Sequence, residues 1–395
     1  MSQGFSIQRE GDIEILVPTS ENGKVTSEMP AFYNPAMATN RDIAVACIAA
    51  FTKGQDRRIA ACDFLAATGV RGLRYLGLKG VDEVHMNDIR PSALELIFEN
   101  LKRNYRTADV RREEGKISCK VDDKRVFITT HEAHLFLAEH KRSFDVVDLD
   151  PFGSPAEFLP SALRSARHRS MLCVTATDTA TLCGRYPRTC ARRYLATPLK
   201  TSYKHETGLR ILAGYVTRLA ASMEVAARPV LSHATAHYYR VYFRLRGSRS
   251  AADSALGSVG WAAHCAKCDA RETYNGFLPP SPRCCGEPMS VFGPLWIEGM
   301  NRPAFVQAAS ENLPTGATPE ARKVMEGLSR EIDTFSYFDL HHLASLERRQ
   351  VPPTDSVVEG LLELGYRVSP THITPTGLKT DAPAKELTRI IRRIS

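Results

Sequence analysis

The sequence contains no apolar run that approaches the ~18–20 residues of a membrane-spanning helix. Its beginning, MSQGFSIQRE, lacks the basic-then-apolar pattern of a signal peptide. It has no repeat of about 20–50 residues and no low-complexity tract. These absences exclude helical membrane proteins, secreted precursors and repeat arrays. We therefore expect a soluble, cytoplasmic protein without a membrane partner, and the oligomeric state stays open, with a monomer as the simplest expectation.

The composition is that of an ordinary globular protein with a basic excess. The 395 residues are 43% hydrophobic and 24% charged, which excludes a disordered or fibrous chain and predicts two or three domains. Lysine and arginine number 52 against 44 acids, and the net charge of +8 favours a polyanionic partner. Nucleic acid is therefore the first class of partner to test.

Short apolar segments alternate with segments of helical periodicity. We predict strands at residues 58–65, 81–89, 117–121, 144–149, 171–177 and 237–245, and helices from residue 73, at 91–105 and at 132–140. Such units favour an α/β fold whose parallel sheet binds a ligand at the carboxyl ends of its strands. Acids follow these strands at Asp88, Asp122, Asp123 and Asp150. We expect them to cluster around that ligand.

The sequence becomes small and polar after residue 247, which places a domain boundary near Ser248. Residues 1–248 form the expected ligand-binding domain, and residues 249–395 form a smaller α+β domain. Helices of the second domain are predicted from residues 318–320, at 338–346 and at 354–364, before a strand-like stretch at 366–373. Three helices with a hairpin favour a winged-helix-like module.

The first strand-to-helix turn departs from the dinucleotide-binding fingerprint. Ala67 stands where that motif has its first glycine, while Gly69 and Gly72 are in register. Asp88 follows the next strand, 19 residues after Gly69, where it can accept hydrogen bonds from ribose hydroxyls. A tight turn in any doubly wound fold is the plain alternative, but the pair favours a nucleoside-containing cofactor. No hydride-transfer constellation accompanies it, which disfavours a nicotinamide dehydrogenase.

The segment Asp150-Pro151-Phe152-Gly153 suits group transfer to an exocyclic amine. The lone pair of a purine amine is shared with the ring, so an acceptor must take a hydrogen bond from the amine and leave the lone pair aimed at the electrophile. The Asp150 carboxylate can do this with the Pro151 carbonyl, while Phe152 stacks on the base. The same four residues also make a good turn, which is the alternative.

Together these motifs resemble the tRNA guanine-26 N2-dimethyltransferase family, compact archaeal members in particular. The matching blocks are Phe32-Tyr33-Asn34-Pro35, Asn40-Arg41-Asp42, Ala67-Thr68-Gly69-Val70-Arg71, Asp148 to Pro155, Ala176-Thr177-Asp178, Gly293-Pro294-Leu295-Trp296 and Pro375 to Thr380. The resemblance covers residues 32–384. It implies a class I, Rossmann-like methyltransferase fold, S-adenosyl-L-methionine as donor, tRNA as partner, and one or two methyl transfers to N2 of a guanine.

The resemblance also implies roles for single residues. At the cofactor these are Arg41 and Arg71 at the methionine end, Gly69 in the turn, Asp88 at the ribose, and Asp122, Asp123 and Lys124 at the adenine. The family often has a small residue at the position of Lys124, so the lip of the adenine pocket is expected to differ. Asp150, with Pro151, would position the amine, and Phe32 and Phe152 would sandwich the guanine.

Four of the ten cysteines, Cys265, Cys268, Cys284 and Cys285, fall close together in the second domain. A C-x-x-C pair followed by a second pair approximates a structural zinc site, although the second pair is adjacent. His264 could complete the site with one of Cys284 and Cys285, and a reduced, metal-free loop is the alternative. Methyl transfer needs no activated water, which disfavours catalytic zinc.

Basic residues offer candidate RNA contacts. Arg185, Arg188, Arg192 and Arg193 are spaced to share one helical face, and a solvated basic helix is the alternative. Lys379 lies in a family-like block and is predicted to contact phosphate. Arg389, Arg392 and Arg393 are expected to be exposed without such a role.

Two other functions remain open at this point. One is a methyltransferase acting on another RNA or on DNA, which only the substrate would distinguish. The other is a non-catalytic RNA-binding zinc protein, which cofactor binding would oppose. The acids at the predicted strand ends favour an enzyme.

Overall fold

The computed structural model describes residues 4–19, 31–235 and 237–394, and it divides into two compact units. The first unit comprises Met1–Pro151, Glu157–Val174 and Gln307–Arg322, and the second comprises Phe152–Ala156, Thr175–Val306 and Lys323–Ser395. The domain boundary predicted near Ser248 falls inside the second unit, between β11 (Tyr238–Gly247) and α9 (Arg249–Leu256).

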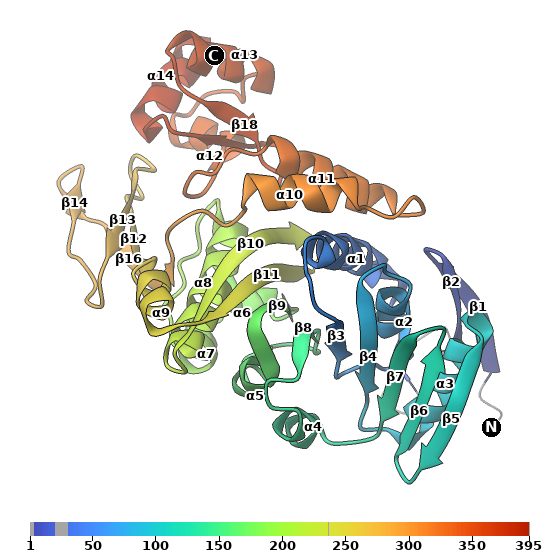
Figure 1. The fold of residues 1–395 in the computed structure, drawn as a ribbon. Coiled ribbons are helices and arrows are strands. Elements are labelled where there is room, and N and C mark those ends of the chain that lie inside the picture. Colours follow the sequence, from blue (N-terminus) through green and yellow to red (C-terminus); the bar gives the residue numbers. More distant parts are fainter. Residues whose placement is uncertain (1–3, 20–30, 236, 395) are drawn as a thin grey trace. The chain divides into compact units, whose positions relative to one another are not determined.

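The first unit contains the predicted alternation of strands and helices (Figure 1). Its elements are β1 (Gly4–Glu10), β2 (Ile13–Thr19), η1 (Pro35–Met37), α1 (Ala38–Thr52), β3 (Ile59–Asp63), α2 (Val70–Leu76), β4 (Val81–Asn87), α3 (Pro91–Asn104), β5 (Thr107–Glu113), β6 (Lys116–Val121), β7 (Lys124–Thr129), α4 (Ala133–Glu139), β8 (Phe144–Leu149), α5 (Leu159–Ser165) and most of β9 (Ala166–Ala176). β1 and β2 form a separate antiparallel pair.

The strands of this unit form a mixed sheet in the order β9-β8-β3-β4-β7-β6-β5. The five strands from β9 to β7 are parallel, and β6 and β5 add an antiparallel edge. Every residue of β3 and β8 is buried. Continuous apolar strands of this kind are expected where helices cover both faces of a parallel sheet. The predicted α/β, Rossmann-like fold is confirmed.

The direction in which the chain crosses the sheet reverses between β3 and β8. From β3 the chain passes through α2 to β4, whereas from β7 it returns through α4 to β8. Because β-α-β crossovers are right-handed, α2 and α4 cover opposite faces. Ligands bind at such a switch point, beyond the carboxyl ends of the strands. Asp63 ends β3 and Asp150 follows β8, so both stand at this point.

The expectation that Asp122 and Asp123 lie at the same edge is wrong. β6 runs antiparallel to β7, and the two acids form the turn between them. β7 is parallel to β4, so this turn lies at the amino-terminal edge of the parallel strands, opposite Asp88 and Asp150. An apolar strand pattern carries no information about strand direction, which is why the sequence placed the turn at the wrong edge.

The second unit is built from helices and several antiparallel sheets. Its elements are α6 (Thr179–Leu182), α7 (Pro187–Tyr194), α8 (Lys204–Ala221), β10 (Val225–Thr235), β11, α9, β12 (Val259–His264), β13 (Arg271–Asn275), β14 (Arg283–Cys284), β15 (Glu287–Pro288) and β16 (Ser290–Trp296). β10 pairs with β11, and β12 pairs with both β13 and β16. The helices α10 (Pro303–Glu311) and α11 (Pro319–Arg330) each contain residues of both units.

The C-terminal part of the second unit has its own core. It comprises β17 (Phe338–Asp339), α12 (Leu340–Leu346), α13 (Thr354–Glu363), β18 (Val368–Pro370), β19 (Gly377–Thr380) and α14 (Ala384–Ile394). The strands form a three-stranded sheet in the order β17-β19-β18, and Leu343, Leu361 and Ile391 pack in a common cluster. Helix, helix and hairpin follow one another as predicted for a winged-helix-like module. Among the described residues, no helix has the length and apolar character needed to cross a membrane.

Candidate active site and metal centre

Arg71 lies at the centre of the candidate active site, in the first turn of α2. Its Nη2 donates to Asn40 Oδ1 at 3.0 Å and to the Asp150 carboxylate. Its Nη1 faces Asp148 Oδ2 at 3.4 Å, and the Tyr75 hydroxyl donates to that same oxygen at 2.5 Å. The guanidinium is buried, whereas the Asp150 side chain is 19% exposed. Arg71 therefore joins the end of β8 to α1 and α2 and leaves Asp150 accessible.

The site holds more negative charge than positive charge. Burial raises the pKa of Asp63 to about 7, reinforced by the carboxylates of Asp148, Asp150 and Asp88 and opposed by Arg71. Arg71 forms ion pairs with two of these carboxylates, Asp148 and Asp150. An excess of this kind at a switch point attracts a cationic ligand, and a strongly shifted carboxyl marks a functional site.

The turn between β3 and α2 brings the backbone close to the carboxyl end of β4. Gly69 has φ of 77°, and a Cβ there would lie 2.9 Å from Ile97 Cγ2, so a side chain is excluded. The Ala67 amide donates to Asp88 Oδ2 at 2.9 Å, and the Arg90 amide donates to Oδ1 at 3.0 Å. Asp88 is half-buried and held beside the turn. The two predicted cofactor residues, Gly69 and Asp88, are thus brought together.

Arg41 is engaged in a different way from Arg71. Its Nε and Nη2 donate to the two oxygens of Glu10 at 2.6 and 2.5 Å, and its Nη2 also donates to the Asn34 carbonyl at 3.1 Å. Tyr33 and Arg74 bind the same Glu10 carboxylate at 3.0 and 2.9 Å. The Nε–Nη2 edge of the Arg41 guanidinium is therefore occupied by Glu10. No sequence motif indicated this pairing, because Glu10 lies outside the motifs.

The segment after β8 presents an aromatic ring. Pro151 is buried, whereas Phe152 is 72% exposed. Gly153 has φ of 78°, and its amide donates to Thr177 Oγ1 at 2.6 Å, which anchors the residue after the ring. An exposed aromatic ring two residues from an accessible carboxylate is suited to stacking on a planar base. Phe32, the other aromatic predicted at the site, is half-buried.

The residues predicted at the adenine do not join this site. Lys124 Nζ donates to the carbonyls of Leu76 and Leu78 at 2.7 and 2.8 Å, at the far end of α2. Residues 130–132 instead follow β7 at the carboxyl edge of the sheet. Asn87, the last residue of β4, holds this segment, because its Oδ1 accepts a hydrogen bond from the His131 amide at 3.0 Å. These residues form a polar run, Thr-His-Glu, between an apolar strand and a helix. This run could have marked the carboxyl edge of the sheet in the sequence, but it was overlooked.

Two further residues of the site were overlooked. Asn40 and Asp148 both contact Arg71, and both belong to motifs quoted above. The spacing of Asp148 and Asp150 contained a usable signal, because residues two apart in an extended segment point to the same side.

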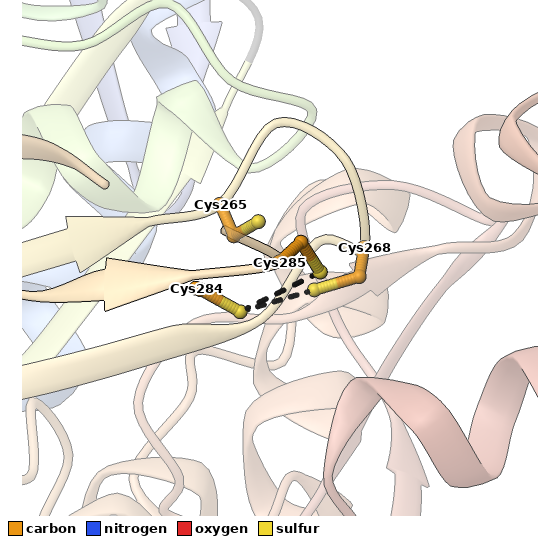
Figure 2. A group of neighbouring side chains, drawn as sticks. All are labelled: Cys265, Cys268, Cys284 and Cys285. Carbon is orange, nitrogen blue, oxygen red and sulfur yellow. Dashed lines mark hydrogen bonds between the residues drawn. The ribbon is translucent and has the colours of Figure 1, made fainter. Parts of the chain in front are cut away.

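Four cysteine thiols converge in the second unit (Figure 2). The Sγ atoms of Cys265, Cys268, Cys284 and Cys285 all lie within 4.8 Å of one another. Cys284 Sγ lies 3.5 Å from Cys268 Sγ and 3.8 Å from Cys285 Sγ. Sulfurs bound tetrahedrally at about 2.3 Å from zinc are separated by about 3.8 Å. The set therefore fits a tetrahedral four-thiolate zinc site.

Backbone geometry explains how adjacent cysteines share this cluster. Cys285 has φ of 51° and is followed by Gly286 in the turn between β14 and β15. The left-handed conformation turns the Cys285 side chain towards the same centre as Cys284. His264, the alternative ligand, is not part of the cluster, and its Nδ1 lies 3.2 Å from the Tyr203 hydroxyl.

The predicted basic face is exposed. Arg185 precedes α7, and Arg188, Arg192 and Arg193 lie on it, all four exposed to solvent. Arg193 also donates to Asp178 Oδ2 at 3.1 Å. In contrast, the exposed residues of α13 in the C-terminal module include Asp355, Glu359 and Glu363. Phosphate contacts are therefore better served by α7 than by α13.

Lys379 is not available to phosphate. Its side chain is 4% exposed, and Nζ lies 3.3 Å from Glu206 Oε2 and 3.2 Å from Glu331 Oε1. The expected phosphate contact is replaced by a buried ion-pair network. The last helix agrees with expectation: Arg389, Arg392 and Arg393 are exposed, and each pairs with a glutamate.

Comparisons with known proteins agree with this geometry. A family model described as "N2,N2-dimethylguanosine tRNA methyltransferase" matches residues 11–392. The tRNA (guanine(26)-N(2))-dimethyltransferase of Methanothermobacter thermautotrophicus is 39% identical over 97% of both chains. That of Thermococcus kodakarensis is 37% identical over 98% of both chains.

A solved structure extends the agreement to the fold. Trm1 from Pyrococcus horikoshii, in complex with S-adenosyl-L-methionine, is 34% identical to this chain. The two superpose with a TM-score of 0.88 over 98% of this chain and 99% of that chain. The chain therefore belongs to the N2,N2-dimethylguanosine tRNA methyltransferase family.

Proposed function

We propose that this protein transfers one methyl group, and then a second, from S-adenosyl-L-methionine to the exocyclic N2 of guanine 26 in tRNA. The observation that carries the proposal is the accessible Asp150 carboxylate held by Arg71 at the switch point, two residues before the exposed Phe152. Family membership names the substrate, and the site supplies the matching chemistry.

In this mechanism, Asp150 positions the amine. Its carboxylate accepts a hydrogen bond from N2–H, which keeps the nitrogen lone pair directed at the electrophile. When bound, the cofactor would supply the methyl group of its sulfonium, whose bond to sulfur breaks to leave a neutral thioether. After transfer, the nitrogen carries a positive charge, which the Asp150 carboxylate stabilises until the proton is lost to it or to water. Phe152 and Phe32 stack on the guanine, which must leave its place in the folded tRNA at a cost of a few kcal/mol.

The cofactor is proposed to bind along the carboxyl edge of the sheet. Arg71 binds its carboxylate, Asp88 its ribose hydroxyls, and the turn at Gly69 allows close approach. The carboxyl excess around Asp63 suits a ligand with a sulfonium and an ammonium group. Residues 130–132 are proposed to contact the adenine, in place of Asp122, Asp123 and Lys124.

The tRNA is proposed to lie against the exposed arginines of α7. Arg188, Arg192 and Arg193 contact phosphates there, and their binding energy offsets the cost of extruding the base.

The direct test uses the purified protein, S-adenosyl-L-methionine and an unmodified tRNA transcript, followed by digestion and mass spectrometry of the nucleosides. N2,N2-Dimethylguanosine at position 26 is expected, and a transcript with adenine at this position is the control. Only monomethylguanosine would remove the second transfer. A product on the control transcript, or no product at all, would contradict the proposal.

We also propose that the four cysteines bind one structural zinc ion. The sulfur separations fit tetrahedral coordination, and a zinc site stabilises its loops by holding them together. Metal analysis of the purified protein should give one zinc per chain, and the Cys268→Ser variant should lose it together with thermal stability. A metal-free protein of unchanged stability after chelation would contradict this proposal.

A further inference from the structure

A directed chain of hydrogen bonds begins in the segment that carries Phe152. The Ala156 amide donates to Ser154 Oγ at 3.3 Å, and Ser154 Oγ donates to the Tyr194 hydroxyl at 2.9 Å. Tyr194 in turn donates to Asp178 Oδ1 at 2.6 Å. All of these residues belong to the second unit. This series of hydrogen bonds ends on a carboxylate, which can only accept. Each of the two hydroxyls therefore accepts one hydrogen bond and donates one.

A second set of bonds holds the same segment one residue earlier. Besides the Gly153 amide bond to Thr177 Oγ1, the Gly153 carbonyl accepts the Thr177 amide at 2.9 Å and the Asp178 amide at 3.3 Å. Gly153 is therefore bound directly to residues 177–178, and Ser154 is linked to Asp178 through Tyr194. Phe152 protrudes from an anchored backbone.

Tyr194 is buried in a way that requires its hydroxyl to be paired. The residue has no exposed surface. Burial, together with the neighbouring Asp178, raises the pKa of Tyr194 well above its usual range, so the phenol keeps its proton at neutral pH. A buried hydroxyl without partners would be destabilising, and here it has Ser154 on one side and Asp178 on the other.

We propose that Tyr194 is a positioning residue for methyl transfer, which holds the segment carrying Phe152 in the geometry that receives the target base. The inference rests on the proposed function, because it takes Phe152 and Asp150 as the groups that meet the guanine. Loops that carry catalytic groups are mobile unless their backbone is anchored, and small displacements of such groups are costly in rate.

The outer end of the chain reaches the basic face of α7. Asp178 accepts from Tyr194 through Oδ1 and from Arg193 through Oδ2 at 3.1 Å. Arg193 is 48% exposed, whereas Asp178 is 9% exposed. The arginine face proposed to meet tRNA is thereby connected to the segment that carries Phe152.

The test is Tyr194→Phe, which deletes one hydroxyl and keeps the ring. The matched control is Tyr215→Phe, because Tyr215 packs edge-on against Tyr194 with ring centroids 5.6 Å apart but is not a link of the chain. Tyr194→Phe is expected to lower kcat for tRNA methylation about 10–100-fold. Its affinity for S-adenosyl-L-methionine should be unchanged, and its thermal midpoint should fall no further than that of the control.

Ser154→Ala provides a second measurement at the other end of the same bond. It should reduce kcat in the same way, and combining it with Tyr194→Phe should add little, because both variants break the bond between Ser154 and Tyr194. Additive losses, a wild-type kcat in Tyr194→Phe, or an equal loss in Tyr215→Phe would overturn the inference. If one of these outcomes is found while the wild-type protein methylates guanine 26, the inference about Tyr194 fails and the proposed function stands. If the wild-type protein does not methylate guanine 26, the proposed function itself fails.

Discussion

Two buried networks of opposite character lie in the two units. In the first unit, the charged groups that act on Asp63 include the carboxylates of Asp88, Asp148 and Asp150 and the guanidinium of Arg71. In the second unit, Glu206 and Glu331 are matched by Lys379 and Arg210, and His372 also contacts Glu331. Asp150 in the first network is partly exposed, whereas the second network is almost wholly buried.

The two networks differ in their balance of charge and in their access to solvent. In the first network, burial raises the pKa of Asp63 to about 7, and the neighbouring carboxylates add to this rise against the opposing charge of Arg71. In the second network the pKa of Glu206 is lowered, because Lys379 and Arg210 outweigh the cost of burial. The number of ionic contacts is therefore a poor guide to function, and the balance of charge together with access to solvent is a better one.

The largest expected effect is that of Asp150→Ala in the first network. It removes the proposed acceptor for the amine, and methyl transfer to tRNA should fall by about 10²–10⁴-fold. Binding of S-adenosyl-L-methionine, measured by calorimetry, should remain. A variant with wild-type turnover would end the assignment of Asp150 and with it the functional reading of this network.

Lys379→Met should act on stability in the second network. Removing the cation leaves Glu206 and Glu331 buried with one partner fewer, and breaking such a network costs about 3–5 kcal/mol. Denaturant unfolding should report this loss, while the folded fraction retains its affinity for tRNA. Weaker tRNA binding at unchanged stability would instead support a phosphate contact by Lys379.

The two networks should respond to pH in opposite directions. The folded pKa of Asp63 is raised from 3.8 to about 7, so between these values the folded state holds a proton that the unfolded state has released. Stability from this group falls as pH rises through that window, by about 1.4 kcal/mol for each pH unit. Asp63→Asn should flatten this dependence in unfolding experiments at several pH values.

Glu206 provides the contrasting half of this test. Its folded pKa is lowered from 4.5, so its contribution is present above pH 4.5 and is lost as pH falls below it. Glu206→Gln should therefore lose stability at neutral pH and differ less from the wild type in acid. If the stability of the Asp63 and Glu206 variants changed with pH in the same way, charge balance would not distinguish the two networks.

The smallest effects are expected at exposed arginines outside both networks. Arg192→Ala on α7 should raise KM for tRNA and reduce the salt dependence of binding by about one phosphate contact. Arg392→Ala on α14 is the matched control, because its guanidinium pairs with Glu347 at 2.5 Å. Equal effects of the two variants would remove the distinction between the basic face of α7 and a merely solvated helix.

Much of the fold could be predicted because its signals are local. The apolar runs ending near Asp63 and Asp150 became β3 and β8, and the periodic stretch from Pro91 became α3. The sequence also predicted that Asp150 follows a buried strand. The order of the strands in the sheet then places Asp150 at the switch point. The cysteine spacing likewise indicated a cluster, since two short turns are enough to bring the thiols together.

What failed depended on strand direction and on distant partners. Asp122 and Asp123 follow a correctly predicted strand, but that strand is antiparallel to β7, and periodicity is the same in either direction. Lys379 belongs to a motif, yet its burial is decided by Glu206, which lies 173 residues earlier. Nothing in the neighbourhood of either residue distinguishes these outcomes.

The sequence by itself determined the α/β class, the family, the acid after β8 and the four-cysteine cluster, because each rests on residue types within a few turns of one another. Only the tertiary structure decided that Arg41 is paired with Glu10, that Arg71 holds Asp150, and that Tyr194 is bonded to Ser154. Those contacts join segments 31 to 79 residues apart. Which polar groups meet across such distances is set by the packing of the elements that carry them, and no local pattern encodes it.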